Sequence, residues 1–197
     1  MSSDTVVAIT PEGADVPRNR RQEETFRKVL HAGLEMLRET SYADLTVRAV
    51  AARAKVAPAT AYTYFSSKNH LIAEVYLDLI RQAPFFTDVN DSRLDRVQQA
   101  LRSLALVIAD EPEVAVACTT AVLSNDAGVP RVRDRIGAEI HKRIKSALGP
   151  DADPQIVSAL EMTYYGALVH AGSGTLTYHQ VADRMAYVVG LILREES

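Results

Sequence analysis

Several residue patterns are scarce or missing in this chain, and each absence excludes a class of protein. The 197 residues include a single cysteine, Cys118, so no internal disulfide framework and no cluster of thiolates is expected. No apolar run is long enough to cross a bilayer, and the N-terminus lacks the basic start and apolar core of a secretory signal. We therefore expect a protein of the reducing cytoplasm without membrane association.

Patterns that would support catalysis are also missing. The five histidines form neither a His-Glu-x-x-His pair nor a Glu-x-x-His motif, so neither a zinc site nor a di-iron site is predicted. No glycine-rich loop is placed to cradle a phosphate, and Cys118 has no neighbouring group that would activate it as a nucleophile. We expect no catalytic residue, no metal and no cofactor, and an enzyme is not predicted.

Apolar side chains recur at helical spacing along the chain, while no alternation typical of a strand persists and no fixed-period repeat occurs. The sequence therefore predicts an all-α fold, with a three-helix head followed by a helical bundle. The predicted helices span about 22–39, 47–54, 58–64, 67–82, 92–109, 112–123, 132–148, 154–171 and 177–193. The segment 112–123 is apolar on nearly every side, which indicates a buried helix.

The stretch Thr46–Lys68 predicts two short helices joined by a tight turn. Thr46 is suited to cap the first helix, because its hydroxyl accepts a hydrogen bond from a free backbone N–H. Residues 55–57 form the turn, and Pro58 fits the first position of the second helix, where its missing N–H costs nothing. Two short helices joined in this way form a helix-turn-helix, whose second helix enters the major groove of DNA. The first helix packs through Val47, Val50, Ala51 and Ala54.

The side chains that this motif exposes are of types that contact DNA. The hydroxyls of Thr60 and Thr63 can donate to phosphates or base edges, and the tyrosine hydroxyls and the Lys68 ammonium are donors directed at phosphate. Ser66 or Ser67 is expected to cap the next helix, whose N-terminus then meets a phosphate. The predicted DNA-contacting residues of the motif are Thr46, Arg48, Ala59, Thr60, Tyr62, Thr63, Tyr64 and Lys68. The alternative is a helical hairpin in a bundle with the tyrosines packed inside.

Basic charge is concentrated at this end of the chain. Residues 18–70 carry ten Lys or Arg against five Asp or Glu, whereas residues 71–197 carry twelve against seventeen. Such asymmetry is typical of a small nucleic-acid-binding domain on an acidic body, although half-chain charges also differ by chance. Arg20 and Arg21 precede the first predicted helix, either as an arm that reaches the minor groove or as a solvated basic segment.

At these residues the sequence resembles the TetR family of transcriptional regulators, over roughly Glu23–Leu79. The family has a Thr that opens the first helix, a small residue in its middle, and then the pattern T-x-Y-x-[HY]-F-x-[SN]-K. The matching residues are Thr46, Ala51, Thr60, Tyr62, Tyr64, Phe65, Ser67 and Lys68. Lys55 stands where the family usually has Gly, so we expect it in a left-handed conformation at a cost on the order of 1 kcal/mol. Ala57 offers no side chain to cap the second helix.

The resemblance implies a DNA-binding domain at 18–70 and an effector-binding and dimerisation domain at 71–197. Residues 1–17 lack periodicity and are expected to form a disordered tail. The family relationship further implies a homodimer that represses transcription from a palindromic operator and is released by a small apolar or acyl-type effector. The sequence around Arg48–Leu71 is also similar to actinobacterial regulators of steroid and lipid catabolism. The alternatives are a helical module that binds a protein or small molecule but not DNA, and a helical enzyme acting on its bound ligand.

Two groups of residues in the body bear on these partners. The last two helices are rich in small and apolar residues, and in the family the equivalent pair forms a four-helix bundle across a two-fold axis. The predicted interface residues are Ala167, Ala171, Val181, Met185, Val188 and Ile192, with a monomer that packs them in its own core as the alternative. Polar and aromatic residues within apolar helices suit either a ligand pocket or ordinary packing. The predicted pocket residues are Leu104, Cys118, Thr119, Val122, Tyr164, Tyr165 and Leu168.

Overall fold

The computed structural model describes residues 19–85, 88 and 90–194, and the predicted tail at 1–17 lies outside them. Every regular element within these residues is a helix, which confirms the predicted all-α fold. The helices are α1 (Arg20–Glu39), α2 (Val47–Arg53), α3 (Pro58–Tyr64), α4 (Lys68–Gln82), α5 (Arg93–Leu106), α6 (Pro112–Leu123), α7 (Val129–Leu148), α8 (Pro154–Gly172) and α9 (Tyr178–Arg194). The helices predicted at 58–64 and 112–123 have the expected bounds, and the others differ by three residues or fewer at each end.

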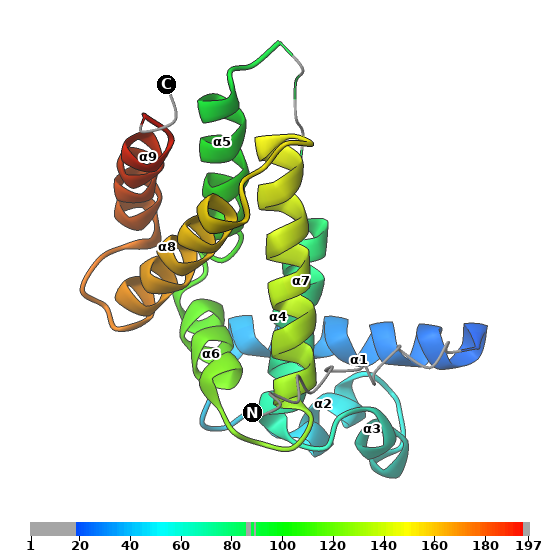
Figure 1. The fold of residues 1–197 in the computed structure, drawn as a ribbon. Helices are drawn as coiled ribbons and strands as arrows, with labels where there is room; N and C mark the ends of the chain where they lie inside the picture. Colours follow the sequence, from blue (N-terminus) through cyan, green and yellow to red (C-terminus); the bar gives the residue numbers. More distant parts are fainter. Residues whose placement is uncertain (1–18, 86–87, 89, 195–197) are drawn as a thin grey trace, which may run out of the picture.

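Figure 1 shows a head and a body joined by one helix. The head consists of α1, α2 and α3 at the lower end, and α5 to α9 form the body, most of which lies above the head while α6 lies beside α1. α4 starts in the head and continues into the body, where it packs against α6 and α7. All residues from Leu71 to Leu77 of α4 are buried, so the helix passes through the core. α4 is therefore the helix that links the core of the body to the head.

The first helix begins earlier than the sequence predicted. Asn19 forms a capping box, in which its side chain accepts the backbone N–H of Gln22 at 2.9 Å and the Gln22 side chain accepts the Asn19 N–H at 2.9 Å. Arg20 and Arg21 consequently lie in the first turn of α1, and Arg20 pairs with Glu24 at 3.2 Å. The predicted arm ahead of the helix is therefore wrong for these two arginines, because the cap places them inside it.

The turn between α2 and α3 has the geometry expected from its sequence. Lys55 adopts φ 55°, the left-handed conformation in which the family usually has Gly. The backbone N–H of Val56 then bonds to the carbonyl of Ala51 at 2.9 Å and closes the end of α2. Ala57 precedes α3 without a side-chain cap, and Pro58 occupies its first turn. The head therefore contains a local strain that one substitution can relieve.

Replacing Lys55 with glycine should raise the free energy of unfolding by up to about 1 kcal/mol, because glycine adopts this conformation without the steric cost of a Cβ. The matched control is Lys55→Ala, which removes the same charge but retains the Cβ and should give no such gain. Urea denaturation followed by circular dichroism measures both. Equal stability of the two variants would show that the positive φ carries no cost here.

α6 is less buried than its composition predicted. Its inner face contacts α1, α4, α7 and α8, but Val116 and Leu123 on the outer side are 51% and 62% exposed. The prediction of a fully buried helix is therefore wrong for the single chain, because an apolar composition does not specify how many sides of a helix are covered. No helix in the described part of the chain combines the length and apolar character needed to span a membrane.

Candidate nucleic-acid interface and ligand pocket

Aromatic and small side chains pack the inner face of the short helix α3 against the rest of the head. Ala61 and Phe65 are fully buried, and the Phe65 ring stacks on Phe26 of α1 with centroids 5.0 Å apart. Tyr64 is half-buried and meets Phe26 edge-on at 6.1 Å. A helix of seven residues is too short to be stable alone, so this packing fixes its position.

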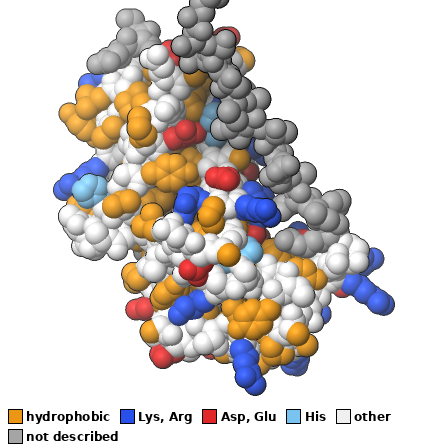
Figure 2. Space-filling model, turned by 60° about the horizontal axis from the view of Figure 1, so that its bottom comes forward, with side chains coloured by type: hydrophobic (Ala, Val, Ile, Leu, Met, Phe, Trp, Pro, Cys, Tyr) orange, Lys and Arg blue, Asp and Glu red, His pale blue; other side chains and the backbone are white. Residues whose placement is uncertain are grey.

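The opposite face of α3 is open to solvent. Ala59, Thr60, Tyr62 and Thr63 are exposed there, and Tyr62 is 52% exposed. Figure 2 turns this end of the molecule toward the viewer and shows separate Lys and Arg side chains at its lower and right-hand edges, with apolar and uncharged side chains between them. The sequence predicted Ala59, Thr60, Thr63 and Tyr64 on this outer face, and the first three are exposed there. The prediction is wrong for Tyr64, which is half-buried against Phe26, and the exposed tyrosine is Tyr62, whose ring was expected in the core.

The threonines of the motif use their hydroxyls differently. The Thr46 hydroxyl oxygen caps α2 by accepting the N–H of Ala49 at 3.1 Å, as its sequence position predicted. The Thr63 hydroxyl donates to the carbonyl of Thr60 at 2.6 Å, within its own helix. The Thr63 hydroxyl hydrogen is therefore already bonded, which the sequence analysis did not anticipate when it assigned this hydroxyl to DNA.

The Lys68 ammonium is not directed straight at solvent. It donates to the backbone carbonyls of Tyr42 at 2.8 Å and Ala43 at 3.4 Å, and it lies 4.2 Å from the centre of the Tyr42 ring. Two of its three N–H groups thus hold the loop after α1 to the start of α4, which leaves one for a phosphate. This contact could not be predicted from the sequence, because Tyr42 and Ala43 lie 26 and 25 residues before Lys68 in the chain.

Four predicted or neighbouring cations remain exposed on the head. Arg48 lies in the first turn of α2, Lys55 in the following turn, and Arg20 and Arg21 at the start of α1. Arg53, by contrast, pairs with Glu35 and Glu39 of α1. Arg48 and Lys55 therefore flank α3 as cations that are available to an external anion, whereas Arg53 stabilises the head internally.

The loop between α6 and α7 is bonded to the start of α4. The side-chain amide of Asn69 donates to Ser124 and Asp126, both at 3.0 Å, and the Ser66 hydroxyl donates to the carbonyl of Ala127 at 2.5 Å. Hydrogen bonds from Ser67, Ser124 and Asn69 hold the pKa of the Asp126 carboxyl below its ordinary value. The body therefore contacts the head immediately after α3.

Glycine is required at the end of this loop. Gly128 has φ 91°, and a Cβ there would lie 2.6 Å from Nδ1 of His70. The backbone at position 128 thus lies so close to the His70 ring on α4 that any residue with a Cβ would clash there. The turn-forming residues of the loop were visible in the sequence, but the element that they contact was not.

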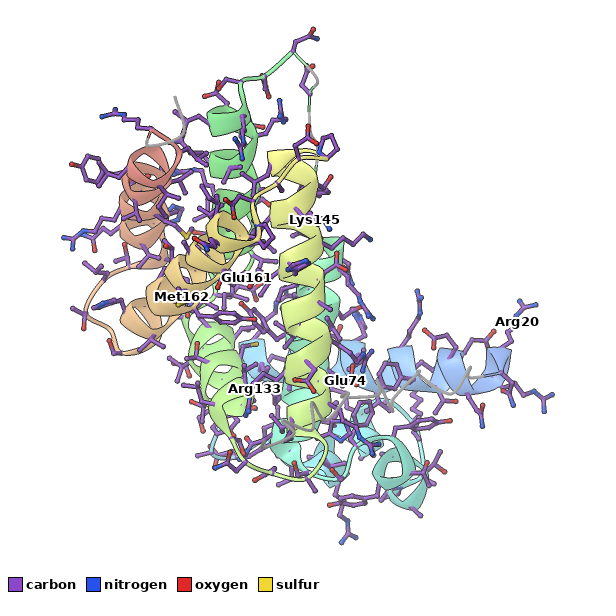
Figure 3. All side chains as sticks on the ribbon, in the orientation of Figure 1. Arg20, Glu74, Arg133, Lys145, Glu161 and Met162 are labelled. Carbon is purple, nitrogen blue, oxygen red and sulfur yellow. The ribbon has the colours of Figure 1, made fainter. Side chains whose placement is uncertain are left out.

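α7 also holds α4 farther along its length. Glu74, which is buried, accepts a hydrogen bond from Nη1 of Arg135 at 2.6 Å, and Figure 3 shows Glu74 beside the lower part of α7. Buried Arg143 donates to the carbonyls of Ile80 at 2.5 Å and Ala83 at 3.2 Å, which lie at the end of α4. Arg143 thus donates to carbonyls at the C-terminal end of α4, and Arg135 binds the middle of the same helix, so α7 and α4 are coupled at both points.

Four of the predicted pocket residues meet in the core of the body. Leu104, Cys118 and Tyr164 are fully buried, and Thr119 is half-buried beside them. The Tyr164 hydroxyl lies 3.0 Å from that of Tyr76 on α4, a partner that the sequence analysis missed. Burial raises the pKa of the Tyr76 and Tyr164 hydroxyls and of the Cys118 thiol, so all three are neutral at physiological pH.

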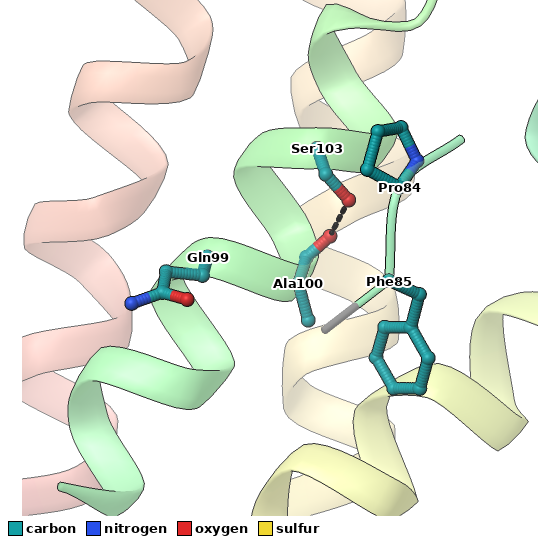
Figure 4. Close-up of a pocket in the computed structure, with 5 residues that line it drawn as sticks. All are labelled: Pro84, Phe85, Gln99, Ala100 and Ser103. Atoms are coloured by element: carbon teal, nitrogen blue, oxygen red, sulfur yellow. Dashed lines mark hydrogen bonds between the residues drawn. The ribbon is translucent and has the colours of Figure 1, made fainter. Parts of the chain in front are cut away.

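The remaining predicted pocket residues lie at the edge of this group. Val122 and Leu168 are half-buried, and Tyr165 is 37% exposed while its ring meets Tyr164 edge-on at 5.9 Å. A separate hollow of about 180 Å³ lies one helical turn from Leu104, between the end of α4 and α5. Figure 4 shows the residues that line it: Pro84, Phe85, Gln99, Ala100 and Ser103. None of these five was predicted, because the segment that follows α4 meets α5 there only in the folded chain.

Three of the six residues predicted for the dimer interface are covered within the chain itself. Ala171, Val181 and Met185 are buried within the chain, and Ala167, Val188 and Ile192 are half-buried. The most apolar stripe of each helix faces its own core, since α9 packs on α5 and α8. The large apolar side chains left exposed on the two helices are Met162, Tyr165, Val169, Tyr187 and Leu191, with Met162 labelled in Figure 3.

Comparison with known proteins identifies the family. Residues 29–75 match the model of the bacterial regulatory proteins of the tetR family. Over 201 residues the chain is 66% identical to the uncharacterized HTH-type transcriptional regulator Rv0767c of Mycobacterium tuberculosis, which covers 98% of this chain and 94% of that protein. The chain belongs to the TetR family. Membership confirms that it is a helix-turn-helix protein of transcription regulation that binds DNA.

Two further relatives extend the likeness to the body. The HTH-type transcriptional repressor KstR of Rhodococcus jostii is 27% identical over 210 residues, covering 100% of this chain and 95% of that protein. A TetR transcriptional regulator from Rhodococcus sp. RHA1 has the same fold, with a TM-score of 0.76 at 22% identity, over 89% of this chain and 98% of that one. The TetR fold therefore includes the α5–α9 body as well as the head.

Proposed function

We propose that this TetR-family chain is a ligand-responsive repressor that binds a palindromic operator as a homodimer. A small apolar or acyl-type effector that binds the body would release it. The observation that carries the proposal is the packing of α3: Phe26 and Phe65 stack beneath its inner face, while its outer face is exposed to solvent. Under this proposal residues 18–70 bind DNA, and residues 71–197 bind the effector and the second subunit.

The exposed apolar face of α8 and α9 supports the dimer. Met162, Val169, Tyr187 and Leu191 are between 45% and 69% exposed, although their side chains are apolar. Exposed apolar side chains on two helices that pack together are typical of an interaction surface, and a two-fold axis through it would pair the same residues from both subunits. Pairing two subunits also presents two copies of α3 to successive major grooves.

The buried group around Tyr76 and Tyr164 supports an effector site in the body. Its hydroxyls bond to each other at 3.0 Å in an otherwise apolar environment, and the nearby thiol of Cys118 is neutral. An effector that enters there would exchange this bond for one of its own, and the apolar surroundings favour an uncharged group at its buried end. The mass of any small molecule that co-purifies with the protein tests this directly, and a compound with a charged group at its only polar end would contradict it.

The contacts of α4 suggest how the two sites communicate. Tyr76, in the middle of α4, contributes to the buried group, while Asn69, at the start of the same helix, is bonded to the α6–α7 loop. An effector that separates Tyr76 from Tyr164 would favour a different position of α4 and a head spacing that misfits successive grooves. A preference of about 1.4 kcal/mol for that state reduces operator affinity tenfold.

A salt titration of operator binding tests the DNA contact. Arg48→Ala should weaken binding to all duplexes alike and reduce the slope of log K against log salt by about one unit per lost phosphate contact. Lys142→Ala on the exposed side of α7 removes the same charge far from α3 and should leave the slope unchanged. Lys68 is less suitable, because its replacement also breaks the bonds to Tyr42 and Ala43. An unaltered slope for Arg48→Ala, measured by fluorescence anisotropy, would remove Arg48 from the interface.

A further inference from the structure

α3 lacks the side chains that read bases by paired hydrogen bonds. Its sequence is Pro-Ala-Thr-Ala-Tyr-Thr-Tyr, with no Arg, Lys, Asn, Gln, Asp or Glu. Arg and Lys identify guanine, Asn and Gln identify adenine, and Asp and Glu identify cytosine through the edges that these bases present in the major groove. If α3 occupies that groove, it must distinguish bases by other means.

The exposed face of α3 offers methyl groups in their place. Ala59 presents a methyl group near the start of the helix. Thr63 is exposed one turn later, and its hydroxyl is turned back onto the Thr60 carbonyl at 2.6 Å, which leaves the Thr63 methyl as its outward group. The cations that flank the helix, Arg48 and Lys55, come from α2 and the turn. Charge is therefore supplied from outside the helix, while the exposed face of α3 is uncharged and carries methyl groups beside the hydroxyls of Thr60 and Tyr62.

Thymine is the one base with an apolar group in the major groove, the methyl at C5, and Ala and the Thr methyl are the side-chain groups that contact it. We propose that α3 recognises its half-site mainly through thymine methyl groups, with Thr63 and Ala59 as the specificity-determining residues. This inference rests on the DNA binding proposed above and adds the chemistry of base recognition to it. Methyl-to-methyl contact removes apolar surface from water on both partners and favours thymine over every base without a methyl.

The base side of the contact is tested with duplexes that the full-length protein enriches from a random-sequence library. The enriched half-sites should contain thymines, and replacing a contacted thymine with deoxyuridine removes only the methyl. Loss of that methyl contact should weaken binding about three- to fivefold. At the same position cytosine should bind more weakly than 5-methylcytosine, which restores the methyl on a different base. Equal affinity for thymine and uracil at every position of the half-site would overturn the inference.

The protein side is tested with two variants of Thr63 that separate its methyl from its hydroxyl. Thr63→Val keeps a methyl and should discriminate thymine from uracil as the wild type does, whereas Thr63→Ser keeps only the hydroxyl and should lose that discrimination. Thermal melting of both variants verifies that the head is folded. The opposite pattern, with discrimination kept by Ser and lost by Val, would assign recognition to the hydroxyl and overturn the inference. If no duplex is enriched at all, the proposed DNA binding fails, and this inference with it.

Discussion

Leu191→Glu is expected to convert the dimer to monomers and to weaken operator binding by about 100- to 10,000-fold. Leu191 is 45% exposed on the outer face of α9, where Tyr187 is exposed one turn away. A carboxylate at the centre of an apolar interface would be desolvated without a partner in both subunits, which opposes association. A monomer binds one half-site only and loses the effective concentration that links the second head to the first.

Sedimentation velocity and anisotropy on the same samples measure the two effects. The control is Lys142→Glu, which introduces the same residue on the exposed side of α7 and should leave both the dimer and the affinity intact. The earlier candidate, Val188, is a poorer test because it is half-buried, so a charge there would also disturb the packing of α9. An intact Leu191→Glu dimer would place the interface on another face.

Phe65→Ala should lower the free energy of unfolding by about 3–5 kcal/mol and abolish operator binding, because it removes the largest support behind α3. Phe65 is fully buried and stacks on Phe26, and the helix that it supports has only seven residues. Loss of this ring leaves a cavity that the short helix cannot fill by itself. The head would then lose its fixed geometry before the body unfolds.

Tyr62→Ala is the matched control, since it removes an aromatic side chain from the other face of the same helix. Tyr62 is 52% exposed, so stability should change by no more than about 0.5 kcal/mol. Operator affinity should nevertheless fall, because Tyr62 belongs to the proposed contact surface. Urea denaturation combined with anisotropy separates the two cases. A Tyr62→Ala variant that binds as tightly as the wild type would remove this side chain from the interface.

The local features of the head were predictable because their causes lie within a few residues. Pro58 occupies the first turn of α3, and Thr46 caps α2. Lys55, which stands where the family usually has glycine, was correctly predicted to adopt the left-handed conformation. Helical spacing likewise predicted every helix of the body to within three residues at each end. Such features depend on backbone chemistry and periodicity, which a single sequence displays.

The misses involve contacts between residues far apart in the chain. The bonds of Lys68 to Tyr42 and of Asn69 to Asp126 join loops that only the folded chain brings together. Ala171, Val181 and Met185 were predicted at a subunit interface because periodicity finds the most apolar stripe of a helix, but these residues are buried within the chain. Tyr76 was overlooked as the partner of Tyr164 because nothing in α4 distinguishes it from an ordinary core residue.

The position of α3 on DNA can be tested most directly by photocrosslinking. A duplex enriched by the full-length protein, with 5-iodouracil in place of a half-site thymine, is irradiated in the complex, and the crosslinked peptide is identified by mass spectrometry. The expected crosslink lies on the peptide that carries α3, at Tyr62 or a neighbour within Pro58–Tyr64. Crosslinks confined to the body, with none on α3 while the duplex stays bound, would contradict the proposed mode of binding.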